Sequence, residues 1–361
     1  MSGSIETNSG RKSGTIGAKV AGPTVSASDP TITTNATLGT QWANSTSGEF
    51  YVCTDATTDA NVWTNVGSGS GDIDYWAFPG TVSGYSAGGY NDSAYINVIE
   101  KYSLTSDGNS TDVGDLTLAR GFTAGSSSDN HGYAAAGGDG GSYYDRTDKY
   151  SFSSDGNATD VGDATVGRIG PAGASSTTHG YSSSGWTGSG SNVIDKYAFA
   201  SDGDATDVGD STASKSGRAG ISSQTYGYAA GGNGGVNIID KYPFASDTNA
   251  TDVGDITVGR NYVAGNSSTT HGYVSGGTSS SNIIEKFSTS SDGNATDVGD
   301  LTVGRSDCSG SPSTTHGYTS GGYTSSSQNV IDKFTFASDA NATDVGDLLA
   351  IKSYTHGGTQ H

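Results

Sequence analysis

Short apolar stretches separated by glycine, serine and asparagine recur along most of this chain at a regular interval. The pentapeptide ThrAspValGlyAsp occurs six times at nearly even spacing. The copies start at Thr111, Thr159, Thr206, Thr251, Thr296 and Thr343. A period in the high forties suits four short antiparallel strands with their turns, so each repeat is a candidate propeller blade rather than a helical hairpin.

The distances between marker residues inside each repeat are nearly constant. A lysine precedes each ThrAspValGlyAsp at a fixed distance, as Lys101 precedes Thr111, and a basic residue follows its last Asp at a fixed distance. A tyrosine then follows that basic residue at a fixed distance wherever the chain continues, as Tyr133 follows Arg120. The basic residues are Arg120, Arg168, Lys215, Arg260, Arg305 and Lys352. Only the segment between a glycine pair and the next lysine varies substantially, so length variation is confined to one loop per repeat.

Each repeat divides into four predicted strands. The first is a run of small residues after the basic residue, at 122–125 and 262–265 for example, and the second carries HisGlyTyr and ends in a glycine pair. The third has alternating apolar residues, as in AsnValIleAspLysTyr, and the fourth is built on ThrAspValGlyAsp. One such unit cannot bury both faces, whereas radial stacking shields each unit with its neighbours. The small-residue strand is expected nearest the crowded axis.

The two ends of the repeat region complement each other. The first repeat begins at Gly84 and Tyr85 and lacks the preceding basic residue and small-residue strand. The chain finishes with Lys352, SerTyrThrHis and a glycine pair, which is a surplus first strand. The C-terminal strand is therefore predicted to complete the first repeat and close the ring.

A different pattern precedes the repeats. Residues 1–36 show neither helical nor strand periodicity, which predicts an extended N-terminal arm. Three short strand-like runs follow at 40–44, 49–54 and 61–66, separated by turn residues, and they predict a small β-meander organised on aromatic residues. Because three strands alone are marginally stable, this module is expected to dock on the rest of the chain or on a partner. The candidate attachment residues are Trp42, Phe50, Tyr51 and Trp63.

The predicted organisation therefore has three parts. They are the arm at 1–36, the meander with its GlySerGlySerGly linker at 37–71, and the repeats at 72–361.

Composition and charge exclude several classes of function. The chain has 37 acidic and 17 basic residues, a formal net charge of -20 and no Lys/Arg cluster, so a nucleic-acid partner is not expected. It has neither a charged-then-apolar leader nor an apolar run long enough to cross a membrane, so neither secretion nor membrane insertion is expected. Cys53 and Cys308 are the only cysteines and lie far apart, which argues against a disulfide framework and a CxxC metal site.

The candidate chemistry is sparse. His131, His179, His271 and His316 occupy equivalent places, where other copies have Ser83 or Tyr226, and packing explains them better than a metal does. The SerAspGlyAsnAlaThrAsp loops contain oxygen ligands that a cation could use, but they lack EF-hand spacing and are read as Asx-stabilised turns. No metal, cofactor or catalytic residue is predicted.

One further repeated spacing predicts an ion pair. Asp115 lies shortly before Arg120, and every repeat has an equivalent pair at the same spacing, which we interpret as a repeated structural ion pair. Such a pair contributes about 0 to 1 kcal/mol if exposed.

The repeats resemble the kelch repeat. They share its glycine pair at the end of the second strand, its Tyr-bearing third strand and its Arg before the next first strand, and the match covers the chain from Phe78 onward. They depart from it in the fourth strand, where kelch has Trp and this chain has a valine. The valines are Val113, Val161, Val208, Val253, Val298 and Val345. The resemblance implies a six-bladed kelch-like β-propeller in an all-β protein, with inter-blade packing that differs in detail.

The N-terminal module carries a second resemblance. Residues 39–56 and 61–67 look like a short module of tail-fibre and other virion structural proteins of marine bacteriophages, as do tandem acidic, Ser/Gly-rich repeats. This implies a virion protein assembled in the host cytoplasm and attached to other virion proteins by its N-terminal region, as a monomer or an oligomer in the particle. A tail-fibre or adhesin-like role is the main expectation. A capsid- or tail-decorating protein and, with less support, a polysaccharide depolymerase are the alternatives, and we expect no enzyme.

The variable loop is the candidate recognition surface. All six loops are expected on one face of a propeller, where exposed aromatic residues with Ser/Gly/Asn neighbours suit a host-surface glycan or protein. The candidate residues are Tyr90, Tyr95, Tyr143, Tyr144, Asp145, Arg146, Trp186 and Tyr323. Packing of the loop tips on neighbouring blades is the alternative.

Overall fold

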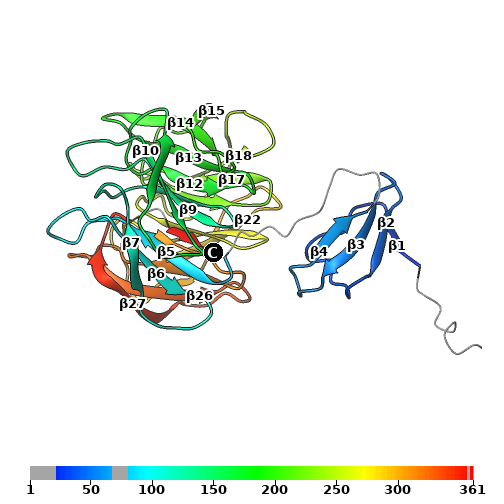
Figure 1. Ribbon diagram of the computed structural model, residues 1–361. Helices are drawn as coiled ribbons and strands as arrows, with labels where there is room; N and C mark the ends of the chain where they lie inside the picture. The colour runs from blue at the N-terminus through cyan, green and yellow to red at the C-terminus, as the bar shows by residue number, and fades with distance from the viewer. Residues whose placement is uncertain (1–21, 67–79, 356–357, 361) are drawn as a thin grey trace, which may run out of the picture. The chain divides into compact units, whose positions relative to one another are not determined.

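A computed structural model describes residues 22–66, 80–355 and 358–360 of the chain. These residues form β-strands, turns and loops, and no helix occurs among them, which confirms the predicted all-β class. The chain divides into two compact units, Met1–Trp76 and Ala77–His361 (Figure 1). Most of the predicted arm and the linker at 67–71 lie outside the described residues.

The first unit is a four-stranded sheet. Its strands are β1 (Thr24–Ser26), β2 (Gln41–Asn44), β3 (Phe50–Asp55) and β4 (Val62–Asn65), in that order. The last three form the antiparallel meander that the sequence predicts, while β1 pairs in parallel with β2, placing Thr24 opposite Trp42. The folded module therefore begins within residues 1–36, where the sequence predicted an arm without strands.

Polar contacts, which leave no hydrophobic periodicity, explain this earlier start. The amide of Ser45 donates to the carbonyl of Ser26 (2.7 Å), and Asn44 Nδ2 donates to Asp29 Oδ1 (2.6 Å). Buried Asn61 accepts a hydrogen bond from the amide of Ala36 (3.1 Å). Hydrogen bonds of this kind add the segment before residue 37 to the meander without any apolar alternation that a sequence pattern would reveal.

The second unit contains six four-stranded antiparallel sheets in a propeller-like arrangement (Figure 1). The first strands are β28 (Gly358–Gln360), β8 (Ala124–Ser127), β12 (Ala172–Ser175), β16 (Ala219–Ser222), β20 (Ala264–Ser267) and β24 (Ser309–Gly310). The second strands are β5 (Ser83–Ala87), β9 (His131–Ala135), β13 (His179–Trp186), β17 (Tyr226–Ala230), β21 (His271–Ser275) and β25 (His316–Ser320). Each sheet thus starts with a short strand that follows a basic residue of the chain, and in the first sheet this strand is β28.

The two remaining strands complete each sheet outward. The third strands are β6 (Val98–Ser103), β10 (Arg146–Ser151), β14 (Gly190–Ala198), β18 (Ile238–Pro243), β22 (Ile283–Ser288) and β26 (Gln328–Thr335). The fourth strands, which carry ThrAspValGlyAsp, are β7 (Thr111–Asp115), β11 (Thr159–Asp163), β15 (Thr206–Asp210), β19 (Thr251–Asp255), β23 (Thr296–Asp300) and β27 (Thr343–Lys352). The predicted division of each repeat into four strands is confirmed.

The C-terminal strand completes the sheet of the first repeat. β28 pairs antiparallel with β5, with Gly358 opposite Ser86 and Thr359 opposite Tyr85. The hydroxyl of Thr359 also lies 2.5 Å from that of Tyr150 in the following sheet. Residues from the two ends of the repeat region therefore share one sheet, which supplies the strand that the first repeat lacks.

The first strands contact one another from sheet to sheet, and glycine makes this close approach possible. A Cβ atom on Gly173 would lie 2.1 Å from the carbonyl oxygen of Gly125, and one on Gly220 would lie 2.0 Å from that of Gly173. Equivalent contacts join Gly265, Gly310 and Gly358 to their predecessors. Since no side chain fits at these distances, the small-residue strands occupy the most crowded positions.

The repeated turn between the third and fourth strands joins neighbouring sheets. Lys101 of one sheet pairs with Asp155 in the turn of the next, and the amide of Asp115 donates to Asn157 Oδ1 (3.1 Å). The same Lys–Asp contact recurs at every step, and Lys333 pairs with Asp107 to join the last sheet to the first. The turns therefore also form contacts between sheets, in addition to the role as turns that the sequence predicts.

A buried ion pair links the connection between sheets to the third strand. Arg120 lies 2.9 Å from Asp148, both side chains are fully buried, and Asp148 also accepts hydrogen bonds from Thr117. The other pairs are Arg168–Asp195, Arg218–Asp240, Arg260–Glu285, Arg305–Asp332 and Lys352–Glu100. The predicted pairing of Arg120 with Asp115 is wrong, because the arginine side chain turns into the sheet that follows it.

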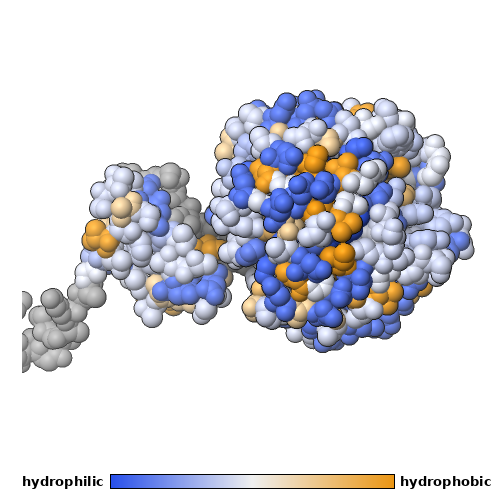
Figure 2. Space-filling view, turned by 180° about the vertical axis from the view of Figure 1, so that it is seen from behind, coloured by the Kyte–Doolittle hydropathy of each residue, from blue (hydrophilic) through white to orange (hydrophobic). Residues whose placement is uncertain are grey.

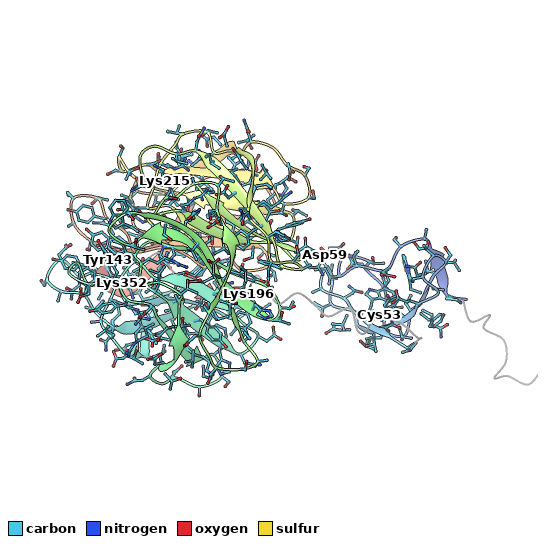
Figure 3. The ribbon with its side chains drawn as sticks, turned by 90° about the horizontal axis from the view of Figure 1, so that it is seen from above. Cys53, Asp59, Tyr143, Lys196, Lys215 and Lys352 are labelled. Atoms are coloured by element: carbon cyan, nitrogen blue, oxygen red, sulfur yellow. The ribbon has the colours of Figure 1, made fainter. Side chains whose placement is uncertain are left out.

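In one repeat, the basic residue of the buried ion pair stands at a different position in the sequence. Lys215, labelled in Figure 3, occupies the place that the constant spacing assigns to the basic residue. Arg218 instead makes the buried ion pair, 2.6 Å from Asp240. Arg218 also donates to the carbonyl oxygens of Gly231 (2.8 Å) and Ala229 (2.7 Å). The forked guanidinium serves all three acceptors at once, which the single ammonium of lysine is less suited to do.

Candidate functional site

The variable loops lie on the same side of their sheets as the connections between sheets. In the second repeat sheet, Ala124 begins β8 opposite Ala135, which ends β9, and Thr147 near the start of β10 also faces Ala135. Arg146 at the start of β10 faces Asp163 at the end of β11. We call the side of the six sheets at these strand ends the loop face. The side at the opposite strand ends, which carries the Asp–Gly–Asn turns, is the turn face.

A ring of six residues with left-handed backbone conformation lies on the loop face. Five of them come two positions before a first strand, and the sixth comes four positions before β28. Their φ angles are between 58° and 67°. The members of this axial ring are Phe122, Gly170, Gly217, Tyr262, Asp307 and Tyr354. Glycine adopts this conformation freely, whereas a bulky residue in it costs about 1–3 kcal/mol.

Backbone hydrogen bonds connect the axial ring into a circle. The amide of Phe122 donates to the carbonyl oxygen of Tyr354 (2.5 Å), and each member from Gly170 to Asp307 donates to the one before it, at 2.6 to 2.9 Å. The amide of Thr355, next to Tyr354, completes the circle by donating to Asp307 (3.5 Å). These bonds over-determine the strained conformation, which allows aromatic residues to persist in it.

Aromatic side chains gather on one part of the axial ring. Phe122 stacks on Tyr354 with ring centroids 4.3 Å apart and lies 5.9 Å from Tyr262. Tyr90 and Tyr95 lie 5.9 and 6.3 Å from Tyr354 and 5.2 Å from each other. We call these five residues the axial aromatic cluster. All five side chains are partly exposed to solvent.

Acidic groups adjoin this cluster. Burial raises the pKa of Tyr95 to about 12, and the nearby charges of Asp139 and Asp307 act in the same direction. Asp307 also raises the pKa values of Tyr262 and Tyr354, after the larger effect of burial. Tyr95, Tyr262 and Tyr354 are therefore neutral at ordinary pH and present hydroxyl groups beside aromatic faces.

The predicted loop residues have different environments. Tyr143 and Tyr323 are 44% and 37% exposed, and Asp145 is exposed. Tyr144 donates to Asp139 Oδ2 (2.7 Å), and Arg146 lies 3.3 Å from Asp160. Trp186 is partly buried.

Three members of the axial aromatic cluster were missed by the sequence analysis. The runs at 122–125 and 262–265 were assigned to strands, but β8 and β20 begin only at Ala124 and Ala264, because Phe122 and Tyr262 are left-handed. A signal was present, since every member of the axial ring follows the basic residue of its repeat by two positions. Tyr90 and Tyr95 are the two cluster members that the loop analysis identified.

Three of the four predicted attachment residues, Trp42, Tyr51 and Trp63, lie in or against the core of the N-terminal module. Trp63 and Tyr51 are buried with Cys53, and Trp42 meets Trp63 edge-on with ring centroids 5.9 Å apart. Phe50 is partly exposed. Trp63 and Tyr51 therefore support the fold of the module. Its strongly exposed apolar side chains are Val25, Leu38 and Val66.

The four histidines at equivalent places in the repeats lie on the turn face. His131 begins β9 opposite Ser151, and burial lowers its pKa, as it does for His179, His271 and His316. Across the described residues, no three His, Cys, Asp or Glu side chains come together in a way that could hold a metal ion. Within the same part of the chain, no helix is long and apolar enough to span a membrane.

Apolar and hydrophilic side chains are interspersed over the side of the repeat unit that Figure 2 shows.

A scan against protein-family models and a search of curated proteins find no match to this chain.

Proposed function

We propose that this chain is a structural protein of a bacteriophage particle, similar to a tail fibre or adhesin. In this proposal the repeats form a six-bladed kelch-like propeller closed by the C-terminal strand, and the N-terminal module attaches it to other virion proteins. The cycle of Lys–Asp contacts, which returns from Lys333 to Asp107, supports six blades. The separation of the chain into two compact units supports a division between attachment and recognition.

The observation that carries a recognition role is the axial aromatic cluster. Gly170 and Gly217 demonstrate that the ring tolerates glycine, yet Phe122, Tyr262 and Tyr354 occupy equivalent left-handed positions at a conformational cost. Partly exposed aromatic faces beside hydroxyl groups suit the apolar face and hydroxyls of a sugar, and aromatic residues also dominate protein-binding hot spots. A host-surface glycan or protein is therefore the proposed partner of the loop face.

The test uses glycine, because glycine relaxes the strained backbone while it removes the ring. Particles assembled with Phe122→Gly/Tyr262→Gly protein are expected to adsorb to host cells at least tenfold less well. The purified variant should retain its melting temperature, which separates lost recognition from lost folding. Asn294→Ala, on the turn face, is the control expected to leave adsorption unchanged.

Other outcomes identify other roles. Normal adsorption together with normal incorporation would favour a capsid- or tail-decorating protein without receptor binding. Loss of incorporation into particles would place the attachment surface on the loop face.

A further inference from the structure

A phenylalanine fills the space between most neighbouring sheets on the turn face. It lies three positions after the repeated lysine and stacks on a tyrosine of the preceding sheet, with ring centroids 4.6 to 4.9 Å apart. The stacked pairs are Tyr85–Phe152, Tyr133–Phe199, Tyr181–Phe244 and Tyr273–Phe336.

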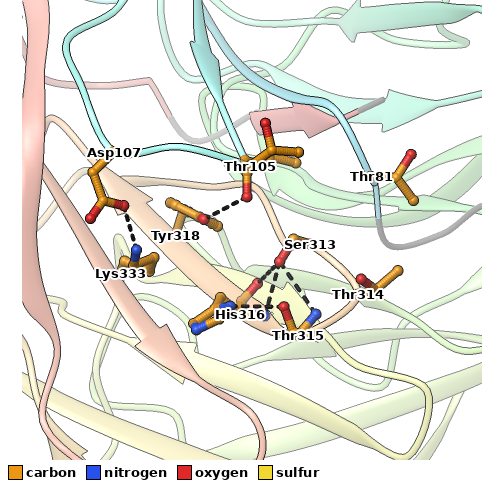
Figure 4. A pocket seen from close by; sticks show the side chains of 10 residues that line it. Thr81, Thr105, Asp107, Ser313, Thr314, Thr315, His316, Tyr318 and Lys333 are labelled. Carbon is orange, nitrogen blue, oxygen red and sulfur yellow. Dashed lines mark hydrogen bonds and ion pairs between the residues drawn. The ribbon is translucent and has the colours of Figure 1, made fainter.

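Two junctions lack this phenylalanine, and they differ in how the space is used. At one of them Thr289 replaces it, but Tyr226 replaces the histidine, and Lys241 Nζ lies 4.9 Å from the Tyr226 ring centroid. At the junction of the last and first sheets Leu104 replaces it, while the smaller His316 is retained. A pocket of about 340 Å³ lies there, lined by both residues (Figure 4).

The lining of this pocket is polar but electrically balanced. Lys333 and Asp107 form an ion pair with each other, and His316 Nδ1 lies 2.8 Å from the Thr315 hydroxyl. Tyr318 donates its hydroxyl to the carbonyl oxygen of Leu104 (3.1 Å), so these two residues present mainly carbon atoms. The hydroxyl-bearing side chains of Thr81, Thr105 and Thr314 surround this apolar part.

We propose that this pocket binds one neutral sugar unit of hexose size. The volume equals that of about ten water molecules, which accommodates a pyranose ring together with some water. The threonine hydroxyls donate and accept hydrogen bonds, as sugar hydroxyls require, and the small carbon surface that Leu104 and Tyr318 expose contacts part of the apolar face of the ring. The internal ion pair and the net charge of -20 disfavour an anionic ligand.

This site is separate from the loop face. His316 begins β25 opposite Thr335, which ends β26, whereas the loop face lies at the opposite end of these strands. The two sites can therefore be removed independently.

The decisive variant is Leu104→Phe, because it restores the residue that four other junctions contain and fills the pocket without a foreign shape. Binding of D-glucose, D-galactose and N-acetyl-D-glucosamine to the full chain would be measured by saturation-transfer NMR and titration. At least one sugar should bind the parent, and Leu104→Phe should lower its affinity at least tenfold while the melting temperature stays equal or rises. Thr314→Val, a change at an exposed rim residue, should weaken binding severalfold.

Matched controls separate this site from the loop face. Phe122→Gly/Tyr262→Gly should bind the sugar as the parent does. The proposal fails if none of the three sugars binds the parent, if Leu104→Phe binds with unchanged affinity, or if the loop-face variant alone abolishes binding. Loss of cell adsorption by the loop-face variant bears on the proposed recognition role and leaves this site unaffected.

Discussion

The guanidinium of Arg120 lies 2.9 Å from the carboxylate of Asp148, and neither side chain is accessible to solvent. Arg120 also donates to the carbonyl oxygens of Ala136 (2.9 Å) and Ala134 (3.0 Å). One side chain thus joins the connection before a sheet to the second and third strands of that sheet. The same device, with small variations, recurs in all six repeat sheets.

Removal of one partner of this pair is expected to be strongly destabilising. Arg120→Met leaves the Asp148 charge buried without its partner, so the free energy of unfolding should fall by about 3–5 kcal/mol. Arg146→Ala is the matched control, because Arg146 and Asp160 lie 3.3 Å apart with both side chains more than one third exposed. The control should change stability by about 0–1 kcal/mol in chemical denaturation. Equal effects of the two substitutions would contradict the importance of burial.

The glycine of ThrAspValGlyAsp is expected to be required for contact between sheets. A Cβ atom on Gly114 would lie 2.2 Å from the carbonyl oxygen of Gly156 in the next turn, and its φ of 149° disfavours other residues. Gly114→Ala should therefore lower the free energy of unfolding by about 1–3 kcal/mol. Gly156→Ala is the control, since a Cβ there meets no atom within 4 Å. A melting temperature that falls more for the control would refute this explanation.

Deletion of residues 358–361 is expected to weaken the first repeat sheet selectively. Without β28, β5 becomes an edge strand and Tyr150 loses its hydroxyl partner on Thr359. Amide hydrogen exchange should accelerate in β5, with a lower overall melting temperature. β17, which lies in another sheet, serves as the internal reference. Unchanged protection of β5 would indicate that the C-terminal strand contributes little.

The buried tyrosines predict a loss of stability in alkali. Burial raises the pKa values of Tyr85, Tyr102, Tyr181, Tyr228 and Tyr273 to about 12, above the ordinary value near 10. A raised folded-state pKa means that the stabilisation is complete below about pH 10 and is lost as the pH rises to about 12. Unfolding and tyrosinate absorbance should therefore increase together over this range.

A single substitution tests the contribution of one phenol. Tyr102→Phe should extend stability to higher pH, because Phe287 and Phe334 occupy the equivalent positions in two other sheets and have no proton to lose. An alkaline transition that does not move would show that Tyr102 is not involved in it.

The sequence predicted the all-β class, the four strands of each repeat and the loop of variable length. This was possible because six copies of one pattern show which positions and spacings are constant. A single ThrAspValGlyAsp segment indicates little, but constant spacing from Lys101 to Thr111 and its equivalents requires constant strand lengths. The surplus segment after Lys352 likewise indicated a sheet shared between the two ends of the repeat region. These properties depend on residue order, which the sequence contains directly.

The partners of the charged residues were decided by tertiary structure. The spacing predicted Asp115 as the ion-pair partner of Arg120, whereas in the structure the partner is Asp148. In another repeat the spacing predicted Lys215 as the basic residue of the pair, whereas Arg218 forms it. A side chain several ångströms long can turn into either of two adjoining sheets, and only the assembled sheets determine which acceptors become buried beside it.

The axial aromatic cluster and the pocket at Leu104 also arise only from the assembly. Phe122, Tyr262 and Tyr354 are far apart in sequence, but in the folded repeats they lie together, each in a left-handed backbone conformation. The pocket lies where Leu104 of the first repeat, which is smaller than the phenylalanine of four other junctions, adjoins His316 of the last repeat. The sequence specifies which residues each repeat contains, whereas the packing of the sheets against one another determines which of these residues come into contact.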